Sequence, residues 1–265
     1  MSRRRWWRLA AASLVVAVVA WSLVGTGVGF GSVIAGRDGA GRILAGLFPP
    51  ALDRPLLAQV GRASIETLQI AVASLVLGAV LAVPLAGLIA GNVAAPRWLA
   101  GAARTTATVL RGVPDLLWAL LFVAAVGLGP AAGVYAISLH AAGMLAKLWS
   151  EQLEAVDPAP VEALRLTGAP RAAVASLAIL PQARTNLLSQ LLYQWECNVR
   201  ASVIVGFVGA GGIGQELGVA LRLFRYQELA TLIIAVLLII ASQDQLSRWI
   251  RAHYGAASRR PDWCG

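Results

Sequence analysis

The chain carries few charged side chains for its length. Of its 265 residues, 13% are Asp, Glu, Lys or Arg, while 58% are hydrophobic. A soluble globular domain carries about 25% charged residues, because its water-facing surface must be largely polar. With roughly half that share, this chain cannot cover a surface that faces water. The composition therefore indicates a protein that is embedded in a lipid bilayer.

Cysteine and histidine are scarce. Cys197 and Cys264 lie far apart, and His140 and His253 are equally isolated. Because no pair has the short spacing of a metal site or a disulfide framework, we expect no metal centre. The phosphate-binding pattern G-x-x-x-x-G-K-[ST] is also missing, so we expect no ATP site in this chain.

Lysine is scarce as well, since all but one of the 22 basic residues are arginine. The formal net charge of +9 could suggest a nucleic acid partner. However, the arginines form short clusters between apolar runs and build no continuous basic stripe. We therefore expect no nucleic acid binding, and we interpret the arginines as markers of membrane topology.

Long apolar runs dominate what is present. Leu9 to Phe30 is uncharged for 22 residues, and about 20 residues cross the hydrocarbon core. The uncharged run from Leu116 to Ala146 is interrupted in its middle by Gly127, Gly129 and Pro130. This interruption predicts a helical hairpin with a tight turn. We expect an all-α polytopic transmembrane bundle. Its six spans are expected at 9–30, 66–91, 111–128, 131–149, 184–207 and 226–246.

The basic residues orient these spans. If the N-terminus is cytoplasmic, fifteen basic residues lie on the inner side and six on the outer side, as the positive-inside rule requires. The inner set is Arg3, Arg4, Arg5, Arg8, Arg97, Arg104, Arg111, Lys147, Arg165, Arg171, Arg184, Arg248, Arg251, Arg259 and Arg260. The outer set is Arg37, Arg42, Arg54, Arg62, Arg222 and Arg225. We expect both termini in the cytoplasm and the first span, within residues 1–30, to be uncleaved.

The longest inner segment, about 150–182, predicts two short helices. These helices are expected at Pro160–Thr167 and Arg171–Leu180, with Gly168-Ala169-Pro170 as the turn between them. The bland alternative is a solvated linker.

Particular residues in this segment resemble the EAA loop of importer-type ABC permeases. The resemblance is carried by Glu162, Ala163, Gly168, Leu180 and Pro181. The family pattern has Ala where Leu164 stands and Ile where Ala178 stands. In this family the loop is the coupling element that docks on the cytosolic ATPase.

A wider stretch, residues 60–250, resembles the membrane domain of phosphonate importer permeases. Two strings carry this resemblance, RGVPDLLWALLFVAAVGLGP and YQWECNVRASVIVGFVGAGGIGQEL. The resemblance implies a homodimer in the cytoplasmic membrane with its pathway at the two-fold axis. It also implies ATP- and Mg-binding ATPase subunits in the cytosol and an external phosphonate-binding protein. Residues 251–265 are expected to form a cytoplasmic tail.

The resemblance therefore implies a transport subunit, and we expect no cofactor and no enzymatic reaction in this chain. The nearest alternative is a permease for phosphite, phosphate or another small oxyanion. A membrane scaffold without transport, or an intramembrane enzyme, is the alternative from another class.

Two charges lie inside the expected fifth span. Glu196 and Arg200 are four residues apart on one helical face, and Asn198 lies between them. Because charges in a membrane are costly, we expect the pair to face water or the bundle interior. We assign Glu196, Asn198 and Arg200 to the translocation pathway. The alternative is a structural ion pair.

The segment Val203 to Gly218 contains a G-x-G-x-x-G pattern. It lies at the outer end of a span, without the strand that a dinucleotide fold needs, so we reject that interpretation. We instead expect a close-packed, bendable gate, with plain helix packing as the alternative. Its glycines are Gly209, Gly211, Gly212 and Gly214. Asp115 is expected to begin a helix, and His140 to bond between helices.

Overall fold

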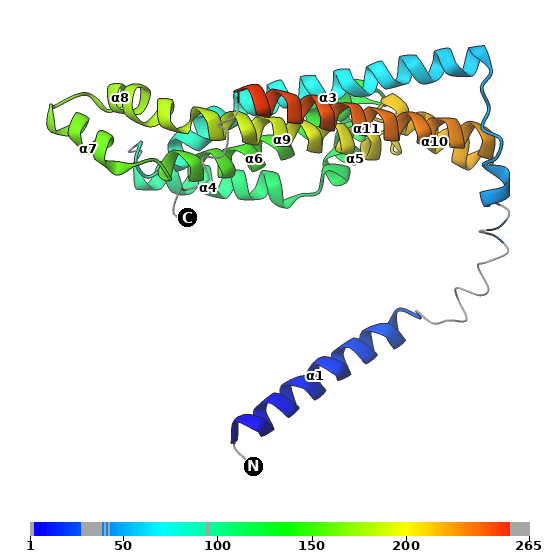
Figure 1. Ribbon diagram of the computed structural model, residues 1–265, viewed down its shortest axis with the longest axis horizontal. Coiled ribbons are helices and arrows are strands. Elements are labelled where there is room, and N and C mark those ends of the chain that lie inside the picture. The colour runs from blue at the N-terminus through cyan, green and yellow to red at the C-terminus, as the bar shows by residue number, and fades with distance from the viewer. Residues whose placement is uncertain (1–2, 28–38, 40, 42, 94–95, 255–265) are drawn as a thin grey trace, which may run out of the picture. The chain divides into compact units, whose positions relative to one another are not determined.

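The computed structural model describes residues 3–27, 39, 41, 43–93 and 96–254, and every regular element in this part of the chain is helical (Figure 1). The chain divides into two compact units, Met1–Pro49 and Pro50–Gly265. The first unit contains α1 (Arg3–Gly25). Its apolar part, Ala11–Gly25, is shorter than a full span. The expected end of the first span at 28–30 and the expected tail at 255–265 lie outside the described residues.

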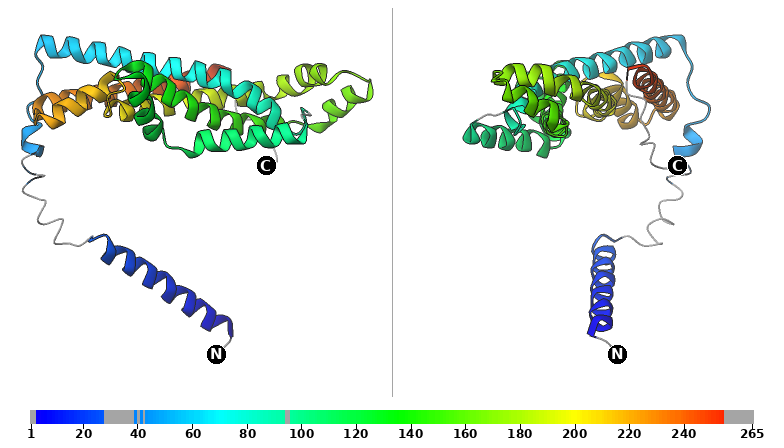
Figure 2. Two further views of the ribbon diagram at one scale, coloured as in Figure 1. Left: turned by 180° about the vertical axis from the view of Figure 1, so that it is seen from behind. Right: turned by 60° about the vertical axis from the view of Figure 1, so that its left-hand side comes forward.

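The second unit is a helical bundle. Its elements in order are α3 (Arg54–Ile89), α4 (Arg97–Gly112), α5 (Asp115–Val126), α6 (Pro130–Glu154), α7 (Pro158–Leu166), α8 (Arg171–Val174), the π-helical turn η1 (Ala175–Ile179), α9 (Leu180–Gly206), α10 (Gly212–Arg222) and α11 (Tyr226–Tyr254). Figures 1 and 2 show α3, α6, α9 and α11 running beside one another, with α7 and α8 projecting from one end of the bundle. This arrangement confirms the expected all-α membrane fold.

Three helices, α3, α6 and α11, are long and apolar enough to cross a membrane. The pair α4 and α5 passes the same test together, although it is bent by 88° at its break. By contrast, α9 is not among these candidates, because polar and charged residues interrupt its apolar sequence.

The expected span 111–128 is wrong in its start, because only α5 (Asp115–Val126) forms a helix within most of that range and α4 (Arg97–Gly112) precedes it. Helix α5 has 12 residues, about 18 Å at 1.5 Å per residue, which is less than the hydrocarbon core of about 30 Å. Pro114 ends α4 early, because the residue before a proline avoids helical geometry and Val113 is extended, with φ −86° and ψ 124°. The span therefore consists of two helices, α4 and α5, instead of one.

Small residues let the central helices approach closely. A Cβ atom on Gly78 of α3 would lie 2.9 Å from Ala141 Cβ and 3.1 Å from the Ser138 carbonyl oxygen of α6. Such contacts are typical of helix packing in membranes, where dispersion replaces the hydrophobic effect as the driving force. The α3–α6 pair is therefore the centre to which the other helices attach.

Candidate functional site

The segment 150–182, named the coupling segment after its expected role, forms a helix, a turn and a second helix at one end of the bundle (Figure 1). Asp157 caps α7 by accepting a hydrogen bond from the Ala159 backbone N–H at 3.0 Å. Gly168 has φ +76°, a left-handed conformation that glycine adopts without strain. The expected first helix is present within two residues of its predicted bounds.

The expected second helix, Arg171–Leu180, differs at its end. It begins as α8 but passes through the π-helical turn η1 and continues directly into α9. Leu180 and Pro181 therefore lie in the first turn of the core helix α9. Proline is accepted there because the first turn of a helix does not use its N–H groups.

The residues of the predicted EAA loop are largely exposed. Glu162, Ala163, Gly168, Leu180 and Pro181 all face outward. Ala163 and Pro181 line one shallow apolar groove, and its other lining residues are Pro160, Leu164, Thr167, Leu177, Ala178 and Gln182. Val161, Val174, Ala178 and Ile179 form a buried cluster in the same segment, and Ala178 belongs to both the cluster and the groove. The segment is thus a packed unit with one exposed face.

A second contact, which the sequence did not reveal, fixes this segment to the bundle. Arg165 of α7 donates a hydrogen bond to the Asn92 carbonyl oxygen at 2.8 Å. The Asn92 side chain donates to the Leu153 carbonyl oxygen, and the Gly91 N–H donates to Glu154 Oε1 at 2.8 Å. These bonds join α7, the end of α3 and the end of α6. No local pattern predicts them, because their partners are distant in the sequence.

The predicted ion pair between Glu196 and Arg200 is wrong, because the two side chains do not pair with each other. Glu196 instead forms an ion pair with Arg251 of α11, which also donates to Ser247 Oγ. The Glu196 side chain is 14% exposed, so α11 covers most of it. Tertiary packing decides this pairing, since Arg251 is 55 residues away in sequence.

Arg200 consequently has no carboxylate partner among the described residues. Its side chain is exposed, and its closest recorded polar contact is Cys197 Sγ at 4.0 Å. Tyr193, seven residues earlier and also exposed, shares the same face of α9. Helix α9 therefore carries an exposed cation without a carboxylate partner among the described residues.

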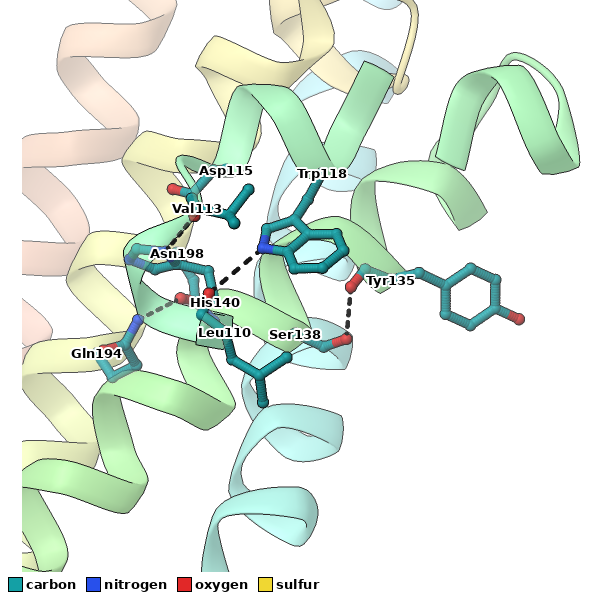
Figure 3. Close-up of polar contacts among 9 residues, drawn as sticks. All are labelled: Leu110, Val113, Asp115, Trp118, Tyr135, Ser138, His140, Gln194 and Asn198. Carbon is teal, nitrogen blue, oxygen red and sulfur yellow. Dashed lines mark hydrogen bonds and ion pairs between the residues drawn. The ribbon is translucent and has the colours of Figure 1, made fainter. Parts of the chain in front are cut away.

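Asn198 lies apart from Arg200, inside the bundle. Its side chain is buried, and its amide lies 2.9 Å from the Gln194 side-chain nitrogen and 3.1 Å from Ser74 Oγ of α3. Figure 3 shows Gln194 and Asn198 meeting on α9. This geometry joins α9 to α3 and does not bring Asn198 to the exposed face that carries Arg200.

Asp115 and His140 meet between α5 and α6, as Figure 3 shows. His140 Nδ1 lies 3.2 Å from Asp115 Oδ1 and 3.2 Å from the Val113 carbonyl oxygen. Asp115 stands in the first turn of α5, where a carboxylate stabilises the helix dipole. Nearby, Trp118 Nε1 donates to the Leu110 carbonyl oxygen at 3.3 Å, across the break between α4 and α5. Both sequence expectations for Asp115 and His140 are confirmed.

The glycine-rich segment forms the turn between α9 and α10. A Cβ atom on Gly214 would overlap the Val203 carbonyl oxygen, so α10 packs directly on the backbone of α9. Gly212 has φ +69°, and its N–H donates to Glu66 Oε1 of α3 at 3.3 Å. The following N–H, of Ile213, donates to Thr67 Oγ1 at 2.8 Å. The described geometry is that of close packing, and a gating role stays a prediction.

Comparisons with known proteins agree with this architecture. Residues 82–255 match the family of binding-protein-dependent transport system inner membrane components. The chain is 40% identical over 193 residues to the phosphite transport system permease PtxC of Stutzerimonas stutzeri, covering 73% of this chain and 70% of that one. It is 39% identical over 220 residues to the phosphate-import permease PhnE of Mycolicibacterium smegmatis, covering 83% and 41% respectively.

The fold has a solved counterpart. The inward-facing MetNI methionine ABC transporter matches with a TM-score of 0.62 and 22% identity, covering 75% of this chain and 99% of the other. The matched residues and the identity to the phosphite permease together show the family. The chain belongs to the inner-membrane components of binding-protein-dependent transport systems, as the membrane-spanning permease subunit of an ABC importer.

Proposed function

We propose that the chain is the permease subunit of an importer that moves phosphonates across the cytoplasmic membrane. The observation that carries this proposal is Arg200 on α9, which is exposed and has no carboxylate partner among the residues that the structure describes. A charged side chain in a membrane helix must face a wet cavity or a protein partner, because facing lipid is costly. Since Glu196 is already neutralised by Arg251, Arg200 keeps its full attraction for an anion.

Phosphite and phosphate are the second candidate substrates. The identities to a phosphite permease and a phosphate permease favour them, whereas the sequence strings quoted above favour phosphonates. All three are small phosphorus oxyanions, and one exposed guanidinium suits each of them, since its donors match phosphate geometry. The choice among the three therefore depends on the external binding protein.

The coupling segment is the proposed docking site for the ATPase. Glu162 and Leu166 are exposed on α7, and the neighbouring groove is apolar. Exposed apolar surface of this kind marks a protein interaction site. We assign ATP and Mg binding to that partner subunit. Movement of α7 would reach the bundle through η1 and through the bond from Arg165 to Asn92.

A second copy of the chain completes the proposed pathway. The exposed face of α9 with Tyr193 and Arg200 would meet its counterpart across a two-fold axis, so that both arginines face the passing anion. The turn at Gly211 and Gly212 would act as the outer gate, beneath an external binding protein that delivers the substrate. The Glu196 and Arg251 pair then has a structural role, because it lies between α9 and α11.

Uptake measurements test this function. The cells lack the chain but keep its ATPase and binding protein. They express either the wild-type chain or Arg200→Ala, and they receive radiolabelled methylphosphonate, phosphite or phosphate in separate experiments. We expect wild type to restore uptake of methylphosphonate, and Arg200→Ala to reduce it at least tenfold at normal protein level. Restored uptake of phosphite alone would reassign the substrate. If none of the three anions is taken up, the alternative of a membrane scaffold without transport would be favoured.

A further inference from the structure

Three arginines lie on one face of α4, a feature that the proposed function does not use. Arg97, Arg104 and Arg111 follow one another at intervals of seven residues, about two helical turns, and all are exposed. Thr108 is exposed between the last two. None of the three arginines forms an ion pair with a carboxylate in the part of the chain that the structure describes.

The backbone of the last of these arginines packs against the middle of α6. Gly143 of α6 packs against it so closely that a Cβ atom there would lie 2.6 Å from the Arg111 backbone nitrogen. Gly143 stands thirteen residues after Pro130 and eleven before Glu154, so about 20 Å and about 16 Å of helix separate it from the two ends of α6. The Arg111 backbone is therefore level with the middle of α6, a helix long and apolar enough to cross a membrane.

This depth decides what Arg111 can face. Arginine stays charged at any physiological pH. Where α6 crosses the hydrocarbon core, its middle lies about 15 Å from the lipid headgroups on either side. An exposed, unpaired guanidinium at this level must therefore face water or protein and not lipid.

The first two arginines line a cavity at the inner end of the bundle. This cavity of about 620 Å³ lies between the last turn of α3 and the first turns of α4, and Ile89, Gly91 and Gly101 also contribute to its wall. Arg104 is held there because its guanidinium donates to the Ile89 carbonyl oxygen at 3.2 Å. Gly91 bonds Glu154 beside the coupling segment, so the cavity opens on the cytoplasmic side.

We infer that α4 carries the inner half of an anion pathway. A phosphorus oxyanion would pass from Arg111 at mid-membrane to Arg104 and Arg97 in the inner cavity. The three arginines are attached to the helix about 10 Å apart along its axis. Each guanidinium can therefore bind the anion weakly and release it to the next. Arg200 lies six residues before the outer end of α9 and would serve the outer half. This inference rests on the proposed function, because it assumes an anionic substrate.

Accessibility of a cysteine at position 108 tests the pathway without any substrate. Thr108→Cys is introduced into a chain that also carries Cys197→Ser and Cys264→Ser, and this chain is assembled with its ATPase. Inside-out vesicles that contain the complex are then treated with an anionic or a cationic methanethiosulfonate of similar size. We expect the anionic reagent to react at least tenfold faster than the cationic one, relative to their rates with a free thiol. Val109→Cys is the matched control, because Val109 is exposed and apolar at the same depth on another face of α4.

Uptake of the substrate accepted by wild type gives the second readout. Arg111→Gln should lower this uptake at least tenfold at normal protein level, whereas Arg111→Lys should retain most of it. In the labelling experiment, Arg111→Gln should abolish the preference of Thr108→Cys for the anionic reagent. Full uptake by Arg111→Gln, or equal labelling at positions 108 and 109, would overturn the inference while leaving the proposed function in place. Failure of wild type to transport any phosphorus oxyanion would instead count against the proposed function.

Discussion

At the scale of single residues, the partner of each charge determines its role. Glu196 is mostly buried and bonded to Arg251, whereas Arg200, four residues further along α9, is exposed and has no carboxylate partner among the described residues. A buried charge that loses its partner destabilises the fold, while an exposed cation beside water does not. The two residues therefore respond differently to substitution.

We expect Arg251→Ala to lower the free energy of unfolding by about 3 kcal/mol, because Glu196 would stay buried without its partner. The double variant Arg251→Ala, Glu196→Ala should recover part of this loss. Arg200→Ala alone should leave the free energy of unfolding unchanged. Membrane protein level and thermal stability in detergent measure the effect. Equal losses for Arg200→Ala and Arg251→Ala would show that Arg200 is also structural.

At the scale of helices, two glycines constrain the backbone for different reasons. A side chain on Gly214 would enter the space of the Val203 carbonyl oxygen, whereas a side chain on Gly168 would meet no atom but would require φ +76°. The first is a packing constraint between α10 and α9. The second is a conformational constraint within the coupling segment, with a strain of about 1–2 kcal/mol for other residues.

For the packing constraint, we expect Gly214→Ala to reduce the amount of folded protein several-fold, since α10 must move away from α9. Gly61→Ala in α3 is the control, because a Cβ atom there meets nothing within 4 Å. Size-exclusion chromatography of the solubilised protein measures both. A normal profile for Gly214→Ala would show that the close contact is not needed for folding.

For the coupling segment, Gly168→Leu should assemble in the membrane, because the position is exposed. Its turn should be strained, so we expect association with the ATPase, or ATP hydrolysis driven by transport, to fall at least fivefold. Co-purification with the ATPase provides the measurement, and Glu162→Lys offers an independent change on the same exposed surface. Normal transport by both variants would exclude this segment as the coupling element.

At the scale of the whole molecule, the contacts at the two ends of the bundle agree with the expected alternation. Ala51, before α3, donates from its N–H to the Gln227 carbonyl oxygen at the start of α11. The end of α3 meets the end of α6 through Gly91 and Glu154. Even without Arg104 and Arg111, which lie further along α4 than Arg97, thirteen basic residues of the expected inner set remain, more than twice the outer six.

Topology reporters test this arrangement. Fusions after residues 50 and 225 should report an external location, and fusions after residues 92 and 170 should report a cytoplasmic one, because the inner side holds most of the arginines. A phosphatase that is active only outside and a fluorescent protein that matures only inside give opposite signals. A cytoplasmic signal at residue 225 would contradict the placement of α9 and α11.

The sequence by itself determined the features that depend on local chemistry. Apolar runs and arginine asymmetry predicted the membrane bundle and its orientation, and the Gly168 turn and the roles of Asp115 and His140 followed from local rules. Tertiary structure alone decided the partner of Glu196 and the bond from Arg165 to Asn92, 73 residues away. It also decided the 88° break between α4 and α5. Local patterns specify which segments are helical and apolar, but the partner of a buried charge depends on which helices pack together.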